Sequence, residues 1–192
     1  MAVRIEIVAG TLCGLLAVCL SGCETLDGLN SSEHTPVVLT PVQHLGSNYS
    51  VSEVRVNGEI AGGAGRGGGG GAMNCCVLLP GTWRPGLVAK VTWKVLDWSN
   101  ENRLETKDGI YRSIRTVGRY VAEVPVEHYD APETLYIHFY QHGKARVVAS
   151  IFSPFDGRHP ISQSPSEASL AVAGTPLADS DNQSGVASPN TK

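Results

Sequence analysis

The stretch LVAKVTWKVLDW, residues 87–98, is the part of the sequence that decides the fold. Apolar and polar side chains alternate along it with a period of two, which is the pattern of a strand that buries one face. The apolar face would carry Leu87, Ala89, Val91, Trp93 and Val95, and the opposite face Lys90, Thr92 and Lys94. We therefore expect a β-strand here, entered through a turn at Pro85-Gly86.

Similar strand patterns occur on both sides of this segment. Extended runs are predicted at 37–44, 51–56, 120–126, 135–140 and 146–151, with turns at 57–58, 130–132 and 142–143. Asn57-Gly58 is a typical two-residue hairpin turn. Because helix patterns are nearly absent, the sequence predicts an all-β domain over residues 35–160, built as an antiparallel β-sandwich or an open barrel.

The first residues have the pattern of a bacterial lipoprotein signal peptide. The apolar run 7–20 is shorter than the roughly 20 residues that span a bilayer, and it ends in small residues. Leu20-Ser21-Gly22-Cys23 matches the lipobox, in which the Cys thiol accepts diacylglycerol before cleavage. We expect a signal peptide over 1–22, lipid such as palmitate on Cys23, and a polar tether over 23–34.

The chain is thus expected to reside in the cell envelope, fixed to a membrane through lipid on Cys23. Glu24 after the lipidated residue favours the outer membrane, with the domain facing the periplasm. The 192 residues carry a net charge of −3 and no basic stripe, which argues against nucleic acid as a partner. Residues 161–192 have few large apolar groups and are predicted to form a disordered tail.

Two segments invite a chemical interpretation. Within the Gly-rich run 62–71, residues 63–68 fit G-x-G-x-x-G, but no helix pattern follows, so we expect a loop between strands rather than a phosphate site. Cys75 and Cys76 are adjacent, and across a trans peptide their Cα atoms would be too close for an ordinary disulfide. Two thiols are the favoured state, and a vicinal disulfide remains an alternative.

No recognised catalytic or metal-binding motif is present. His128, His138 and His142 match no zinc spacing and are expected at the surface or rim, so we predict no metal and no cofactor. Without a nucleophile elbow or a metalloprotease helix, we expect a binding protein rather than an enzyme. Exposed aromatic side chains often anchor partners, and the candidates are Trp98, Tyr136 and Tyr140.

The middle of the chain is similar to a known family over about residues 39–160. The matching blocks are Val56-Asn57-Gly58, the Gly-rich run, Cys75-Cys76-Val77, Leu79-Pro80, Trp83-Arg84-Pro85-Gly86-Leu87, Val91-Thr92-Trp93, Val124-Pro125-Val126, Tyr129, Leu135-Tyr136-Ile137-His138-Phe139, Arg146-Val147-Val148 and His159-Pro160. Together they resemble the proteobacterial lipoproteins catalogued as domain of unknown function 3304. Where that family usually has a Gly-Tyr-Asn-His-Thr type segment, this chain has Gly46-Ser47-Asn48-Tyr49-Ser50.

The resemblance implies a function beyond what the residues indicate. Members of that family often accompany type VI secretion genes, beside phospholipase effectors that attack membranes from the periplasm. The implied role is an immunity protein that binds and neutralises such an effector, with no catalytic residues of its own. A structural or envelope-maintenance lipoprotein without a toxin partner is the alternative, and an enzyme that uses Cys75-Cys76 or a dispersed triad is the third hypothesis.

Overall fold

The computed structural model describes residues 34–68, 74–100, 114–162 and 165–178. These residues belong to one compact unit, 33–192. The signal peptide, the lipidated Cys23 and all of the predicted tether except His34 lie outside the described residues, as do residues 179–192. Within the described residues, no helix has both the length and the apolar character needed to cross a bilayer.

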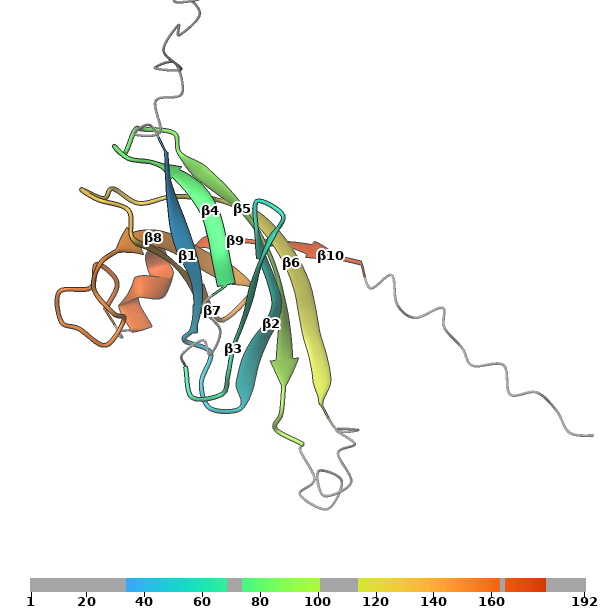
Figure 1. The fold of residues 1–192 in the computed structure, drawn as a ribbon. Helices are drawn as coiled ribbons and strands as arrows, with labels where there is room; N and C mark the ends of the chain where they lie inside the picture. Colours follow the sequence, from blue (N-terminus) through green and yellow to red (C-terminus); the bar gives the residue numbers. More distant parts are fainter. Residues whose placement is uncertain (1–33, 69–73, 101–113, 163–164, 179–192) are drawn as a thin grey trace, which may run out of the picture. The chain divides into compact units, whose positions relative to one another are not determined.

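The described chain forms two five-stranded sheets that pack face to face (Figure 1). One sheet has the order β4 (Asn74–Pro80), β1 (His34–Gln43), β7 (Thr134–Tyr140), β8 (Lys144–Ser150) and β9 (Val172–Ala173). The other has the order β10 (Thr175–Leu177), β6 (Arg115–Pro125), β5 (Val88–Asp97), β2 (Tyr49–Val56) and β3 (Glu59–Ala64). The predicted all-β sandwich is therefore confirmed.

One pairing departs from the antiparallel expectation. Strands β1 and β7 run parallel, with Val38 opposite Thr134, whereas the other paired strands are antiparallel. Parallel neighbours need a long connection, and here the chain builds β2 to β6 between them. The first sheet is thus mixed, and β1 lies inside it.

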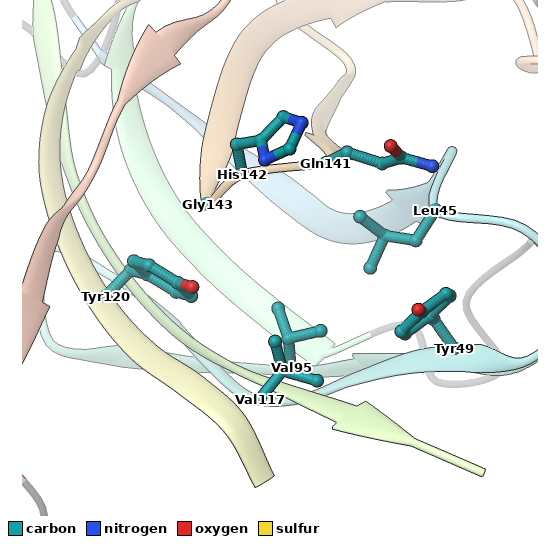
Figure 2. Close-up of a pocket in the computed structure, with 8 residues that line it drawn as sticks. All are labelled: Leu45, Tyr49, Val95, Val117, Tyr120, Gln141, His142 and Gly143. Atoms are coloured by element: carbon teal, nitrogen blue, oxygen red, sulfur yellow. The ribbon is translucent and has the colours of Figure 1, made fainter. Parts of the chain in front are cut away.

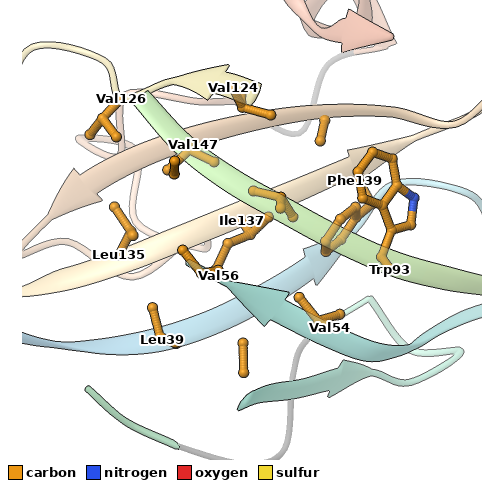
Figure 3. Packing of buried hydrophobic residues seen from close by; sticks show 14 of the residues in the cluster. Leu39, Val54, Val56, Trp93, Val124, Val126, Leu135, Ile137, Phe139 and Val147 are labelled. Atoms are coloured by element: carbon orange, nitrogen blue, oxygen red, sulfur yellow. The ribbon is translucent and has the colours of Figure 1, made fainter. Parts of the chain in front are cut away.

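The strand that decided the fold occupies the centre of the second sheet. Along β5, buried residues alternate with exposed or half-buried ones, and Ala89, Val91, Trp93 and Val95 point into the core as predicted. Side chains from both sheets meet them there, as Figure 3 shows for Leu39, Val54, Val56, Leu135, Ile137, Phe139 and Val147. The hydrophobic core therefore lies between the sheets.

The C-terminal segment is folded where the sequence predicted disorder. A 3-10 helix η1 (Pro165–Leu170) is followed by β9, which pairs with β8, and by β10, which pairs with β6. We call residues 172–177 the clasp, because they add a strand to each sheet. The prediction of a disordered tail from Ile161 is wrong for the described residues up to 178. Backbone pairing of β9 and β10 and the complete burial of Ile161 order this segment, although its amino-acid composition is typical of disorder.

Two further predictions about local structure need correction. The structure joins Cys75 and Cys76 in a disulfide across a cis peptide bond, so the favoured dithiol state, which assumed a trans peptide, is wrong for this structure. Part of the Gly-rich run is strand rather than loop, since Gly62 and Gly63 lie in β3. A Cβ on Gly63 would collide with the carbonyl oxygen of Val51, so glycine there permits the close approach of β2 and β3.

Candidate partner-binding surface

The most exposed large apolar side chain among the described residues lies on the segment after β8. We call residues 151–162 the presenting loop; it stands beside η1, outside the two sheets (Figure 1). Phe155 is 76% exposed and Ile151 is 58% exposed. Aromatic side chains are enriched in the centres of protein interfaces, and exposed apolar groups that lie close together mark contact surfaces.

The presenting loop has a dense internal hydrogen-bond network. The backbone N–H of Asp156 donates to the carbonyl of Ser153, and the N–H of His159 donates to the carbonyl of Asp156, both over 2.9 Å. The Asp156 carboxylate accepts from the Arg158 guanidinium at 3.0 and 2.8 Å, and these bonds lower the pKa of Asp156 to about 2. Arg158 also stacks over Phe152 at 4.2 Å from the ring centroid. Local contacts therefore order the backbone of the loop on both sides of Phe155.

A chain of three histidines ties the presenting loop to the first sheet. His159 bonds through Nδ1 to the carbonyl of Phe152 at 2.8 Å and through Nε2 to Nε2 of His138 at 3.1 Å. Nδ1 of His138 bonds in turn to Nε2 of His44 at 2.8 Å. Burial is the main cause that lowers the pKa of each of the three rings, most strongly for His138. The three histidine rings are therefore uncharged near neutral pH.

A second buried group fastens the segment that follows. Arg146 of β8 binds Glu127 through two hydrogen bonds of 2.7 and 3.0 Å, and it also binds Glu167 of η1. Glu167 accepts hydrogen bonds from Ser162 as well, and the bonds from Ser162 and Arg146 hold its pKa below the usual value. These pairs fix η1 and the end of the presenting loop against the sheet.

A shallow groove of about 220 Å³ runs between the presenting loop and the connection from β6 to β7. Ile151, Phe152 and Arg158 line it from the loop, while His128 and Asp130 line it from the connection. The groove thus combines apolar side chains with both signs of charge, and the exposed Phe155 belongs to the same loop that lines one side of it. Such a combination of an aromatic anchor and a polar rim is suited to binding another protein.

The three aromatic residues proposed from sequence do not take part in this exposed surface. Tyr136 and Tyr140 are buried in a second, smaller core cluster with Val42, Val148 and Ile161, so the exposure that made them candidates is not found. Trp98 is half-buried, donates through Nε1 to the hydroxyl of Ser50 at 2.8 Å, and lies under Arg66. The structure does not bring these three residues together with the presenting loop in one surface.

The histidine prediction is partly wrong. His128 and His142 are exposed, as expected, but His138 is fully buried. The reason is that its face of β7, which the sequence left open to solvent, is covered by His159, Ile161 and the residues of η1. No group of three or more His, Cys, Asp or Glu side chains within the described ranges is arranged to hold a metal ion.

Sequence reasoning did not find the presenting loop. Its segment, Ser153-Pro154-Phe155-Asp156-Gly157, has the Pro, Asp and Gly of a turn. A large aromatic residue inside such a turn is the one signal that pointed to a surface contact.

Comparison with known families supports the resemblance seen in the sequence. A family model described as protein of unknown function, DUF3304, matches residues 46–147, which is more than half of the chain and runs from β2 into β8. The presenting loop lies outside the matched region and is separated from it by the last three residues of β8. No curated protein and no solved structure matches the chain. The chain belongs to the DUF3304 family of proteins of unknown function.

Proposed function

We propose that this protein is a binding protein without enzymatic activity, anchored through lipid on Cys23 and facing the periplasm, that neutralises a secreted phospholipase. The observation that carries the proposal is the exposed Phe155 on a loop held in place by its own hydrogen bonds. A loop backbone that is ordered before binding loses less conformational entropy when a partner covers it. The presenting loop is thus suited to docking.

The proposed partner comes from what the resemblance to this family implies. The DUF3304 resemblance implies a phospholipase effector of a type VI secretion system, and an immunity protein has to meet such an enzyme at the membrane that it attacks. A lipid tether would hold the inhibitor there and raise its effective concentration. Neutralisation then needs only that the loop and its groove cover the enzyme, with no chemistry by this chain.

The test is co-expression with a periplasm-directed phospholipase effector encoded near this gene. We expect that the wild-type protein restores growth, suppresses lipase activity and co-purifies with the effector. Phe155→Ser should weaken binding about 30-fold or more, which corresponds to the roughly 2 kcal/mol typical of an interface anchor. Leu78→Ser, which alters a 64% exposed side chain on β4, is the matched control and should leave binding unchanged.

Two results would contradict the proposal. If the wild-type protein neither binds nor rescues, the structural or envelope-maintenance role is favoured instead. If Phe155→Ser and Leu78→Ser bind as well as the wild type, the partner docks at a surface other than the presenting loop.

A further inference from the structure

A cavity of about 630 Å³ lies on the other side of the histidine chain and shares no lining residue with the groove of the presenting loop. Its charged and titratable lining residues are His44, Arg66, Tyr140, His142 and Lys144, with no carboxylate among the lining residues described. Lys144 forms no ion pair with any described residue. The cavity, which we call the cationic cavity, therefore favours an anion.

Tyr140 supplies a second, independent indication of a ligand. Its side chain is 3% exposed and lines the cationic cavity, and its O–H proton has no acceptor among the described residues. Arg146 lies near this hydroxyl, but a guanidinium has no lone pair and cannot accept the Tyr140 proton. Buried polar groups in proteins are almost always hydrogen-bonded. We therefore expect the Tyr140 O–H to donate a hydrogen bond to an acceptor atom of a ligand that enters the cavity.

The histidine chain determines which nitrogen of His44 can act. Because the Phe152 carbonyl can only accept, His159 carries its proton on Nδ1 and accepts at Nε2. His138 then donates from Nε2 and accepts at Nδ1, so His44 must donate from Nε2. Nδ1 of His44 is left with a lone pair and has no partner among the described residues. It can gain a proton without breaking any bond of the chain.

The protonation of His44 depends on the groups around it. Tyr140 stacks on its ring with centroids 4.7 Å apart, and His138 stacks on it at 5.1 Å. The Glu167 carboxylate favours the protonated form, while burial and His159 oppose it. Arg66 and Lys144 line the same cavity. An anion bound in the cavity would shift this balance towards the protonated ring.

An apolar cavity of about 270 Å³ adjoins the cationic one, and both are lined by Gln141 and His142 of the turn between β7 and β8. Figure 2 shows its side chains around a common space at the mouth between the sheets: Leu45, Tyr49, Val95, Val117 and Tyr120. Val117 is 47% exposed, so the apolar cavity is open to solvent. An apolar pocket beside a cationic one matches a molecule with an alkyl chain and an anionic head.

We propose that the two cavities together bind a fatty acid, with the carboxylate at Tyr140, His44 and Lys144 and the alkyl chain in the apolar cavity. The Tyr140 O–H and the Lys144 ammonium donate to the carboxylate, and His44 takes up one proton at Nδ1 as the anion enters. Binding therefore strengthens as pH falls towards the pKa of the unliganded His44, which burial holds below its ordinary value, by at most about tenfold per pH unit. This site is independent of the proposed immunity function.

The experiment is equilibrium dialysis of the full chain against radiolabelled octanoate, acetate and inorganic phosphate. We expect saturable binding of octanoate and at least tenfold weaker binding of acetate and phosphate, which lack the alkyl chain. Tyr140→Phe, which removes only the unpaired hydroxyl, and Lys144→Gln should each weaken octanoate binding about tenfold or more. Lys90→Gln, which alters an exposed cation on β5, is the control for net charge and should have no effect.

His44→Gln tests the proton uptake separately, because it should remove the pH dependence of octanoate binding between about pH 6 and pH 8. Equal binding of octanoate and acetate would overturn the assignment of the alkyl chain to the apolar cavity. Octanoate binding that is unchanged by Tyr140→Phe and Lys144→Gln would overturn the site itself, since partition into the membrane anchor or detergent would be insensitive to both substitutions.

Discussion

Substitution of Gly174 by alanine should destabilise the domain by opening the clasp. A Cβ at this position would lie 2.6 Å from Cη2 of Trp93 and 3.1 Å from the carbonyl oxygen of Gly143. Trp93 cannot move aside, because it is 2% exposed and its ring packs against Tyr120 at 5.5 Å and Phe139 at 5.3 Å between centroids. Overpacking of this kind costs about 1–3 kcal/mol.

The expected loss for Gly174→Ala is thus about 2 kcal/mol, which for a domain of this size lowers the melting temperature by roughly 4–8 °C. Thermal unfolding followed by circular dichroism measures it. Gly157→Ala is the matched control, because its added Cβ meets nothing within 4 Å and the two substitutions reduce the flexibility of the unfolded chain equally. If both variants melt at the same temperature, the clasp does not pack against Trp93.

Three further predictions concern the core, the ion pairs and the anchor. Phe139→Ala removes a fully buried ring and should lower the free energy of unfolding by about 3–5 kcal/mol in urea titrations; a loss below 1 kcal/mol would contradict its place in the core. Bonds from Ser162 and Arg146 depress the pKa of Glu167, so its stabilising effect is complete above the unfolded pKa of about 4.3 and disappears as pH falls through the folded pKa. Glu167→Gln should therefore be less stable than the wild type at pH 7 and equal to it in strong acid, whereas a gap that persists in acid would refute the charge effect. Cys23→Ala should abolish labelling by radioactive palmitate, and normal labelling of the variant would disprove the lipobox prediction.

The sequence predicted those strands in which apolar and polar residues alternate, because this local pattern indicates which face is buried. β5 was recognised because Ala89, Val91, Trp93 and Val95 alternate with polar residues, and its burial follows that pattern. β3 and β4 escaped because Gly-rich and Cys-containing segments carry no such alternation. Their strand character depends on pairing with β2 and β1, which is a property of the assembled sheet.

The surroundings of the candidate site were harder to predict for a similar reason. His138 reads as exposed because polar and aromatic residues alternate with Leu135, Ile137 and Phe139 on the opposite face of β7. Its burial arises only when His159 and Ile161, from a segment without strand pattern, fold over that face. Sequence periodicity describes one element at a time and cannot reveal which later segment covers it.

The position of β1 affects how fast the domain can assemble. This strand pairs with β4 and, through Val38 opposite Thr134, with β7 on its other side, so its sheet joins residues that are far apart along the chain. Contacts of this kind require long loops to close before any pairing energy is gained, and proteins rich in them fold slowly. Slow folding lengthens the interval during which the newly made chain stays unfolded. That interval is what a secretion channel needs if it threads polypeptides in the unfolded state.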